Sequence, residues 1–319
     1  MAGTRPFRIV VAEPYDAAAL ARLQEVGEVT VLTDSAPESL LAAVANADAL
    51  CVRAKAHVTA RIIEAGTNLK VIARASPTVD HIDLRAAHKR SIPVVYAPHV
   101  AVVSTAEFTL AVMLAAHRRV CSLDRQMRDG KFDALRAPAG HELCNQTLAL
   151  LGVDPVAEVL GRMCSAAFGM KILYHDSTGR TPTDFKGTSR TLDELLTEGD
   201  ILSLHLPASP ATKGILNAER IAMLKPNAIV MNTCRGSLID TTALAHALKR
   251  RLIGGAAIDV FETEPLPMDH PLRFVPNCIL TPHVAGATLD ASADRFNVAD
   301  DVVRVLTGKL PLHAFESVE

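Results

Sequence analysis

The sequence predicts an α/β fold made of two doubly wound parallel-sheet domains. Its 319 residues exceed the usual size of a single domain. Short apolar runs rich in β-branched residues alternate with amphipathic helical patterns along most of the chain. The apolar runs are continuous, which is typical of parallel strands that are covered by helices on both faces of the sheet. We therefore expect two α/β units, each with its own core.

The first of these units begins with five predicted strands. They are RIVVAE (8–13), EVTVLT (28–33), ALCVRA (49–54), KVIARA (70–75) and IPVVYAP (92–98). Helical patterns lie between them, for example DAAALARLQEV and PESLLAAVANA. This regular alternation of strand and helix predicts one complete parallel sheet.

A long helical pattern over about 104–120 and a connection containing Gly and Pro at 129–140 lead to a second alternating series. Its strands are QTLALLG, MKILYHD, DILSLHLP, AIVMNTC, GGAAIDVF and NCILTPH. The last predicted helix, about 290–306, has no strand after it, so we expect it to cross back onto the first unit. Residues 1–99 and 288–319 would then form one discontinuous domain, and residues 100–287 the other.

Composition excludes several classes of function. A formal net charge of −2 offers no electrostatic reason to bind nucleic acid, and no apolar stretch is long enough to cross a bilayer. The six cysteines are scattered, without the paired spacing of a zinc site or the density of a disulfide scaffold. No signal peptide is evident near Met1. We therefore expect a cytoplasmic protein without a bound metal.

A dinucleotide-binding pattern opens the second series. Strand QTLALLG ends at Gly152, a helix follows to about Phe168, and the next strand ends at Asp176, twenty-four residues after Gly152. An acidic residue at that place can bind a ribose and repels a 2′-phosphate, which favours NAD over NADP, although Arg180 lies nearby. A strand-final Asp also has structural uses, so both interpretations of Asp176 remain open.

Three segments carry a family resemblance: VMNTCRGSLID, AAIDVFETEPLPMDHPL and NCILTPHVAGAT. They resemble the signature segments of the D-isomer-specific 2-hydroxyacid dehydrogenases, and the similarity extends over nearly the whole chain. The resemblance implies Rossmann/flavodoxin-like domains with the active-site cleft between them. It assigns NAD binding to residues 100–287 and the substrate (catalytic) role to the discontinuous domain. It also implies a homodimer that acts on a small 2-hydroxy or 2-keto acid.

The same resemblance implies a catalytic trio of Arg235, Glu264 and His283. A guanidinium offers a planar fork of donors to an α-keto carboxylate and polarises the carbonyl that accepts hydride. An imidazole can exchange the hydroxyl proton, and a carboxylate on its other nitrogen fixes the tautomer. Each residue alone could also be a surface or loop residue, but all three follow predicted strands of one domain.

Further site residues follow from the family comparison. The implied cofactor contacts are Gly152, Val156, Asp176, Thr233 and Asp259. Asp259 resembles the residue that binds the nicotinamide carboxamide, while a capped strand end is its structural alternative. For the substrate, the resemblance points to Ser76 and Thr78 in RASPTVDHID, and Arg53 could bind an anion or simply be solvated, as could Lys55.

The phosphate loop departs from the family pattern Gly-x-Gly-x-x-Gly. The three positions hold Gly152, Asp154 and Ala157. Asp154 is a good N-cap acceptor for the amides that would bind a pyrophosphate, and Pro155 has no N–H. At about 4 Å, repulsion between Asp154 and a phosphate would be on the order of 4 kcal/mol, roughly a thousandfold in affinity. We therefore expect weak or lost binding of NAD; Ala157 is the smaller change.

A second departure lies in the substrate loop. Ser76 and Thr78 replace two glycines of the family pattern, and Pro77 between them removes a possible N–H donor. This change is compatible with an altered or absent substrate. In PHVAVVSTAE, His99 could face the cleft or cover a turn, and the turn is the preferred interpretation.

Three hypotheses about function remain at this point. The chain is an NAD-dependent D-2-hydroxyacid dehydrogenase with an unusual phosphate loop, or a cofactor-deficient relative that acts as a binding or regulatory protein. The third is a non-redox acid–base enzyme that uses the His–Glu pair on a keto or hydroxy acid. A titration with NADH separates the first hypothesis from the other two.

Overall fold

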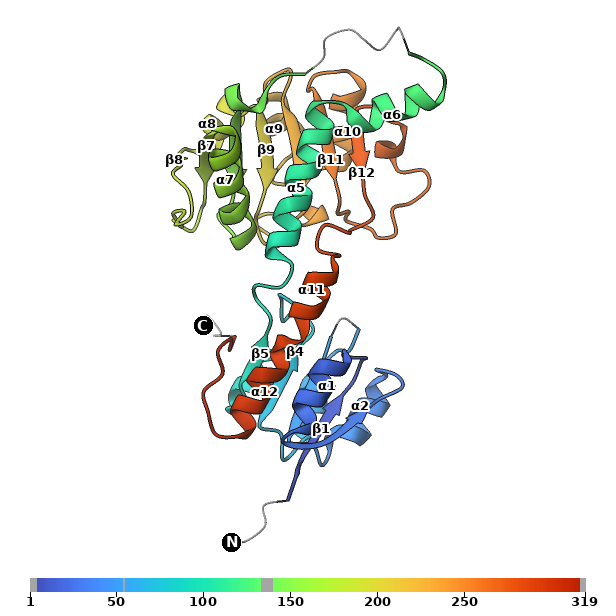
Figure 1. The fold of residues 1–319 in the computed structure, drawn as a ribbon, viewed down its shortest axis with the longest axis vertical. Coiled ribbons are helices and arrows are strands. Elements are labelled where there is room, and N and C mark those ends of the chain that lie inside the picture. The colour runs from blue at the N-terminus through green and yellow to red at the C-terminus, as the bar shows by residue number, and fades with distance from the viewer. Residues whose placement is uncertain (1–4, 54, 133–139, 316–319) are drawn as a thin grey trace. The chain divides into compact units, whose positions relative to one another are not determined.

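The computed structural model describes residues 5–53, 55–132 and 140–315. The chain forms two compact units: the first unit is Met1–Ala101 with Thr288–Glu319, and the second unit is Val102–Ala287. Each unit contains one parallel sheet with helices on both faces, so the predicted fold class is confirmed (Figure 1). Among the described residues, no helix has the length and apolar character needed to span a membrane.

The sheet of the first unit has the strand order β2-β1-β3-β4-β5, and all its strands are parallel. The strands are β1 (Phe7–Val11), β2 (Gly27–Val31), β3 (Ala49–Val52), β4 (Val71–Arg74) and β5 (Val94–Tyr96). Its first helices are α1 (Ala17–Gln24), α2 (Pro37–Val44), α3 (Ala60–Ala65) and α4 (Leu84–Lys89). Every residue of β3 and β4 is buried because apolar clusters cover both faces of these central strands. The strand order reverses between β1 and β3, where this fold type commonly binds ligands.

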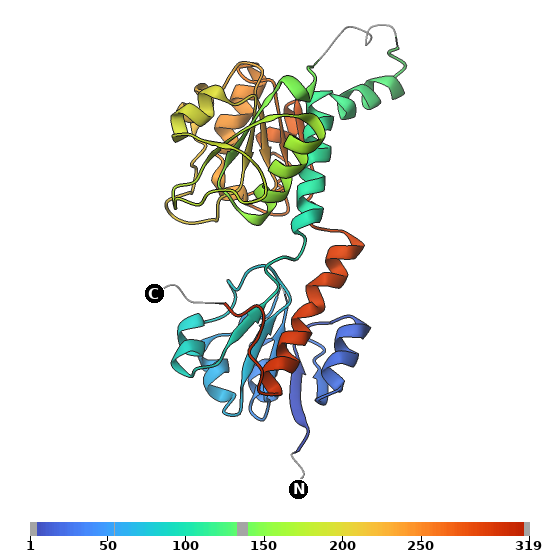
Figure 2. The same ribbon diagram turned by 60° about the vertical axis from the view of Figure 1, so that its left-hand side comes forward.

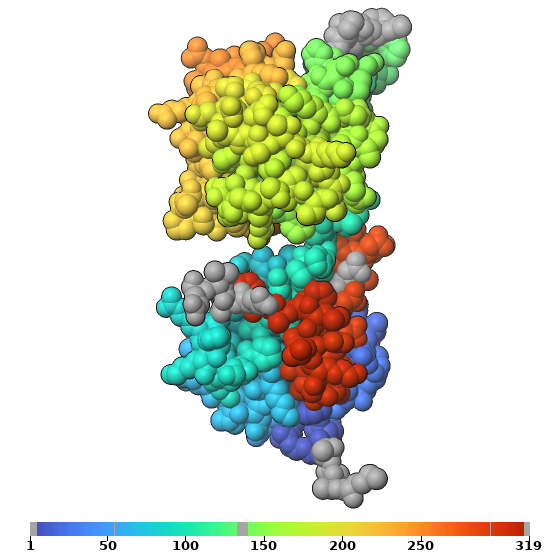
Figure 3. Space-filling view, turned by 90° about the vertical axis from the view of Figure 1, so that its left-hand side faces the viewer, coloured from blue at the N-terminus to red at the C-terminus, as the bar shows by residue number. Residues whose placement is uncertain are grey.

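The C-terminal helical segment belongs to the first unit. It consists of α11 (Leu289–Asp294), a 3-10 turn (Arg295–Asn297) and α12 (Val298–Leu306), so the predicted continuous helix is interrupted once. Helix α12 packs against α1, β4 and β5 (Figure 2). Its buried apolar side chains, such as Val302 and Leu306, belong to one core cluster of that unit. In the space-filling view this red segment lies across one face of the first unit (Figure 3). The helix buries its apolar stripe on a sheet that formed from the other end of the chain.

A buried carboxylate fastens the chain that follows α12. Asp301 is 1% exposed and accepts hydrogen bonds from the backbone N–H groups of Leu312 at 2.5 Å and His313 at 3.1 Å. The Nδ1 atom of His313 lies 3.1 Å from the same carboxylate. The next residues extend the sheet at β5, where the N–H of Phe315 bonds to Val94 at 2.8 Å. Asp301 thus holds the segment that covers the edge strand.

Replacing Asp301 with alanine is expected to destabilise the first unit by about 3 kcal/mol, because two backbone N–H groups lose their buried, charged acceptor. The measurement is the midpoint of urea unfolding. Asp300→Ala is the matched control, since Asp300 is more than half exposed and pairs with Arg22 at the surface. That control should change stability by less than about 1 kcal/mol. Equal effects of the two variants would contradict the role of Asp301.

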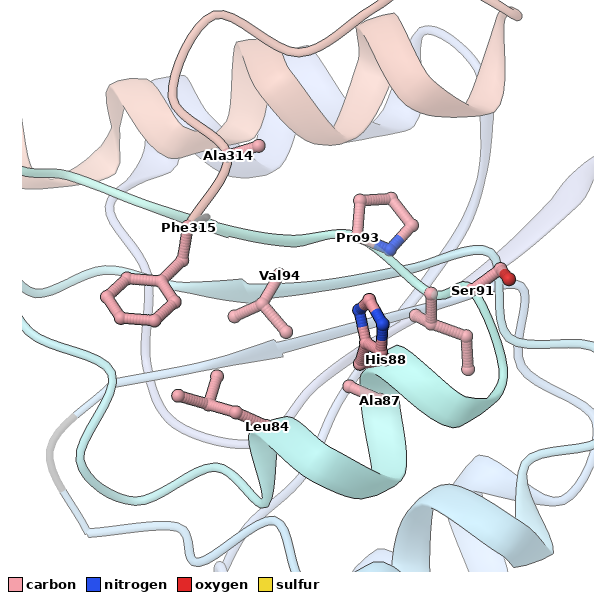
Figure 4. A pocket seen from close by; sticks show the side chains of 9 residues that line it. Leu84, Ala87, His88, Ser91, Pro93, Val94, Ala314 and Phe315 are labelled. Carbon is pink, nitrogen blue, oxygen red and sulfur yellow. The ribbon is translucent and has the colours of Figure 1, made fainter. Parts of the chain in front are cut away.

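A shallow pocket of about 410 Å³ lies beside the same edge. Figure 4 shows side chains from α4, from β5 and from the C-terminal segment around it, with Leu84 and Phe315 toward one end and Ser91 toward the other. None of the residues predicted to bind cofactor or substrate lines this pocket.

The sheet of the second unit has the order β12-β11-β10-β9-β6-β7-β8, again with all strands parallel. Its strands are β6 (Thr147–Leu151), β7 (Lys171–His175), β8 (Thr188–Ser189), β9 (Ile201–Leu204), β10 (Ile229–Asn232), β11 (Gly255–Ile258) and β12 (Cys278–Leu280). The helices that follow these strands are α7 (Pro155–Phe168), α8 (Leu192–Glu198), α9 (Ala218–Ala222) and α10 (Thr241–Lys249). The two-residue strand β8 was not predicted. The order reverses between β6 and β9, which places the loops after these two strands at the switch point.

The long helix predicted at 104–120 is present and ends at residue 117, and a second helix that was not predicted follows it. Helix α5 (Val102–His117) packs against α7 and crosses β10, β11 and β12, whereas α6 (Val120–Arg128) buries none of its residues (Figure 1). Arg119, between them, has a left-handed backbone with φ 56°, which ends α5 and redirects the chain. The predicted connection 129–140 lies partly outside the described residues, since 133–139 are not among them.

Candidate active site

Arg235, Glu264 and His283 each follow one of three neighbouring strands of the second unit. They come after β10, β11 and β12, which pair in register, with Met231 opposite Ala257 and Ala257 opposite Ile279. The carboxyl ends of neighbouring parallel strands meet at one edge of the sheet. The three residues therefore arise from the same edge of one sheet.

His283 and Glu264 are in direct contact. The Nδ1 atom of the imidazole lies 2.8 Å from Oε2 of Glu264, and Oε1 of Glu264 accepts the backbone N–H of Phe261 at 2.9 Å. The His283 side chain is 59% exposed and that of Glu264 is 37% exposed, so the pair is open to a reactant. A carboxylate on Nδ1 leaves Nε2 as the nitrogen that can exchange a proton with another molecule.

The loop that carries His283 has an uncommon backbone. His283 has φ 54°, in the left-handed region where a residue other than Gly needs support from its surroundings. The carboxylate of Asp259, which is 1% exposed, accepts hydrogen bonds from this loop. The structure therefore places Asp259 among groups that fix the histidine loop.

Arg235 is exposed, and its backbone is held by a buried asparagine. Asn232, 1% exposed, donates from Nδ2 to the carbonyl of Arg235 at 2.8 Å and accepts the N–H of Cys234 at 3.1 Å. A Cβ atom at Gly236 would lie 2.0 Å from the backbone of Phe261, so only glycine permits this approach of two loops. Among the residues that the structure describes, the Arg235 guanidinium donates to the carbonyl of Cys234 at 2.7 Å, and its other N–H groups have no partner there.

The phosphate loop contains the self-capped helix start expected from the sequence. Gly152 has φ 101°, and a Cβ there would lie 2.3 Å from the carbonyl oxygen of His205. Asp154 is the N-cap of α7, and its Oδ1 accepts the N–H of Ala157 at 2.7 Å. Pro155 occupies the first helical position and offers no N–H.

The buried partner of Asp154 was missed by the sequence reasoning. The Nδ1 atom of His205 lies 3.1 Å from Oδ1 of Asp154, and its Nε2 atom lies 2.9 Å from Oγ of Ser203. Burial raises the pKa of Asp154, but the charge and hydrogen bond of His205, together with two backbone N–H groups, outweigh it and leave the pKa below its usual range. The sequence offered one signal for this partner, a histidine directly after a buried apolar strand.

The three groups form an acid–histidine–hydroxyl chain, which invites comparison with a hydrolytic triad. Ser203 lies within β9 and is 1% exposed, and the His205 side chain is equally buried. A substrate cannot reach a hydroxyl in that position. The chain of hydrogen bonds instead fixes the carboxylate of Asp154 at the switch point of the sheet.

The remaining predicted cofactor residues lie at the same end of the sheet. Asp176, which follows β7, accepts the N–H of Val153 at 2.9 Å through Oδ2 and the N–H of Thr178 at 2.8 Å through Oδ1. Burial raises its pKa, and these hydrogen bonds lower it to a net value below the usual range. Val156 is half-buried on α7, and the buried hydroxyl of Thr233 lies 2.7 Å from that of Thr109 on α5.

The predicted substrate residues lie in the first unit. Arg53 follows β3, and its guanidinium carbon is 5.8 Å from the ring centre of Phe296. Buried Arg74 donates to the carbonyl of Arg53 at 3.0 Å, and to the carbonyl and hydroxyl of Thr78 at 2.7 and 2.9 Å. Ser76 lies near the N–H of Thr78, at 3.5 Å. Arg74 thus holds both loops at this end of the sheet.

Two further features of the first unit bear on the sequence predictions. The buried carboxylate of Glu13 accepts the N–H groups of Arg53, Lys55 and Ala56, which closes the loop at the switch point between β1 and β3. Like Arg74, Glu13 was not singled out from the sequence. His99 lies in a turn, and its ring packs edge-on against that of His313 with the ring centres 5.7 Å apart.

Comparisons with known proteins show which proteins and folds this chain resembles. A family model described as "D-isomer specific 2-hydroxyacid dehydrogenase, NAD binding domain" matches residues 110–285, which lie within the second unit. The D-3-phosphoglycerate dehydrogenase of Methanocaldococcus jannaschii is 39% identical over 307 residues, which cover 95% of this chain and 58% of that protein. The glyoxylate reductase of Thermofilum pendens is 38% identical over 281 residues, 86% of this chain and 83% of that protein. The crystal structure of the TT0316 protein of Thermus thermophilus matches with a TM-score of 0.85 and 36% identity, and covers 97% of this chain and 100% of that chain.

Proposed function

Because this chain belongs to the D-isomer-specific 2-hydroxyacid dehydrogenase family, we propose that it is an NAD-dependent oxidoreductase that interconverts a D-2-hydroxy acid and its 2-keto acid. The observation that carries the proposal is the 2.8 Å contact between His283 and Glu264. Both residues, with Arg235, arise from the edge of the sheet where enzymes of this architecture bind ligands.

The chain's own residues have distinct roles in this reaction. Nε2 of His283 delivers a proton to the carbonyl oxygen during reduction and removes it during oxidation. Glu264 holds Nδ1, orients the ring and stabilises its protonated form. The exposed guanidinium of Arg235 binds the substrate carboxylate through two parallel N–H groups. The bound dinucleotide supplies or accepts the hydride.

The residues proposed to hold the dinucleotide fit it only in part. Asp176 presents a carboxylate at the end of β7, where a ribose is bound in such sheets, and Gly152 allows the loop to pass close to β9. Thr233 and Asp259 follow the neighbouring strands, and Val156 lies on the first turn of α7. These positions support a nicotinamide dinucleotide on the second unit, and the acidic residue favours NAD over NADP.

The pyrophosphate part of the site fits less well, and we propose weakened cofactor binding for that reason. The N–H groups of Val156 and Ala157 are taken by Asp154, that of Val153 by Asp176, and Pro155 has none. The lowered pKa of Asp154 keeps its carboxylate ionised at neutral pH. A pyrophosphate would therefore meet a negative charge at a helix start whose donors are occupied.

In the first unit, we assign substrate contacts to Arg53, Ser76 and Thr78. The loop Ser76–Thr78 presents two hydroxyl groups where related chains have glycines, and Arg74 fixes its shape through Thr78. Hydroxyl groups favour a substrate with polar substituents over a purely apolar one. The substrate is thus a small polar 2-keto or 2-hydroxy acid.

The test is consumption of NADH with glyoxylate, hydroxypyruvate and pyruvate, followed by absorbance, with NADPH as the comparison. Oxidation of NADH that requires a 2-keto acid supports the proposal. Its absence at millimolar cofactor, with a correctly folded protein, would contradict it.

A second candidate function is a cofactor-deficient binding protein, and the self-capped start of α7 favours it. Calorimetric titration with NADH separates the two functions, because a protein that has lost the cofactor site gives no heat of binding when NADH is added. Turnover of a keto acid without cofactor would instead indicate the non-redox acid–base enzyme.

We also propose a homodimer, because α6 buries none of its residues although one side of it is apolar. On α6, Val120 is 52% exposed and Met127 51%, and Phe132, which follows the helix, is 55% exposed. A helix with an uncovered apolar side is typical of a self-complementary interface.

The expected mass by light scattering is that of two chains. Met127→Glu should give one chain, whereas the control Leu252→Glu, at an exposed position of the same unit, should leave the dimer intact. A single chain in the original protein would contradict the proposal.

A further inference from the structure

The carboxylate of Asp259 is surrounded by the loop that carries His283. Its Oδ1 accepts the hydroxyl of Thr281 at 2.5 Å and the N–H of Val284 at 3.0 Å. Its Oδ2 accepts the N–H of Ala285 at 2.9 Å. With the residue only 1% exposed, both oxygens face the loop, and three of about four acceptor positions are used.

The backbone of Asp259 holds the same loop. Its carbonyl accepts the N–H of His283 at 2.8 Å, so bonds from Asp259 reach residues before, at and after the histidine. His283 itself has the left-handed φ of 54°, a backbone conformation that is unfavourable for a residue other than Gly unless the surroundings impose it. The charged hydrogen bonds of Asp259 are strong enough to impose this conformation.

We propose that Asp259 and Thr281 form a positioning pair that sets the left-handed backbone of His283 and thereby keeps its imidazole on Glu264. Thr281 supplies the one side-chain donor of the set, and its hydroxyl orients the carboxylate toward the two N–H groups that follow the histidine. The pair acts through His283 and does not itself touch the substrate.

The kinetic consequence rests on the proposed dehydrogenase function, whereas the structural consequence does not. A shift of about 1 Å in a proton-transferring group can lower the rate by about a hundredfold, because the donor leaves hydrogen-bonding distance. Loss of one of the three hydrogen bonds to the Asp259 carboxylate should displace the His283 imidazole by less than this distance. We therefore expect a measurable loss in kcat with little effect on KM for the cofactor.

The experiment uses Thr281→Val, which has the same shape without the hydroxyl, and Thr281→Ser, which keeps it. In the full-length protein, the ¹⁵N chemical shift of His283 Nδ1 reports its hydrogen bond to Glu264. Glu264→Ala, which has no side-chain acceptor, serves as the reference for its loss. We expect Thr281→Val to move this signal toward that of Glu264→Ala and Thr281→Ser to retain it. In the activity assay, Thr281→Val should lower kcat about tenfold, with NADH affinity within about twofold of the original.

Three results would overturn the inference. One is an unchanged Nδ1 signal in Thr281→Val, which needs no activity to observe and is therefore independent of the proposed function. Another is an equal change in Thr281→Ser, which would assign the effect to the altered side chain and not to the hydroxyl. The third is a lower melting temperature in Thr281→Val with unchanged kcat and Nδ1 signal, which would show that the pair contributes to stability alone.

Discussion

Replacing His283 with asparagine is expected to lower kcat for 2-keto acid reduction by about a thousandfold. Asparagine keeps a polar side chain in the loop but cannot exchange a proton near neutral pH, and positioned proton transfer contributes about 10²- to 10⁴-fold to rates. Glu264→Gln, which keeps the size but removes the charge, should lower kcat by less. The measurement is steady-state NADH oxidation at saturating substrate.

His246→Asn is the matched control for this prediction. His246 is an exposed histidine of α10 in the same unit, so its replacement should leave kcat unchanged. NADH affinity should be similar in all these variants, because the imidazole acts on the substrate hydroxyl. If His283→Asn retained more than a tenth of the original kcat, the proton would have another route and the role of His283 would be wrong.

Replacing Asp154 with glycine and Pro155 with arginine is expected to tighten NADH binding at least about tenfold, or 1.4 kcal/mol. The double change removes the carboxylate that occupies the first-turn amides, restores one N–H and adds a positive side chain near the pyrophosphate. The original protein should bind NADH only in the high micromolar range or more weakly. Isothermal titration calorimetry on both proteins measures the difference.

Asp240→Gly is the control for a general effect on helix capping. Asp240 caps α10 as Asp154 caps α7, with its Oδ1 2.9 Å from the N–H of Ala243. The control should lose some stability and show no change in NADH affinity. Low-micromolar binding by the original protein would mean that the pyrophosphate avoids Asp154. No gain in the double variant would place the weakness elsewhere in the site.

A single substitution tests the part played by the negative charge of Asp154. Asp154→Asn keeps the N-cap acceptor and the neighbour of Nδ1 but removes the negative charge. Electrostatic repulsion therefore predicts an intermediate gain in NADH affinity, between the original protein and the double variant. Equal affinities for Asp154→Asn and the original protein would assign the weak binding to the occupied amides alone.

Much of the fold could be predicted from local pattern. The apolar runs at 49–54 and 70–75 became central strands because a run that is apolar on both faces is stable only when helices cover both. The terminal helix lacked a strand to follow it, and it packs on β4 and β5 of the first unit. Helix α6 was not predicted, and the left-handed backbone of Arg119 separates it from α5.

The candidate site, like the fold, could be predicted only in part from the sequence. The three signature segments identified the family, and the comparisons confirm that resemblance. The self-capping of α7 by Asp154 followed from residue types at adjacent positions, because capping is a local interaction. The roles assigned to Arg235, Glu264 and His283 remain predictions that the variants above test.

The sequence by itself determined the two α/β units, the family and the altered phosphate loop, because each depends on residues close together in the chain. Only the tertiary structure showed that His205 lies beneath Asp154, that Glu13 closes the Arg53 loop, and that Asp259 holds the loop of His283. The partners in these contacts are between 22 and 51 residues apart. Such contacts depend on strand order and register, which bring distant strand ends to one edge of a sheet and which local periodicity does not encode.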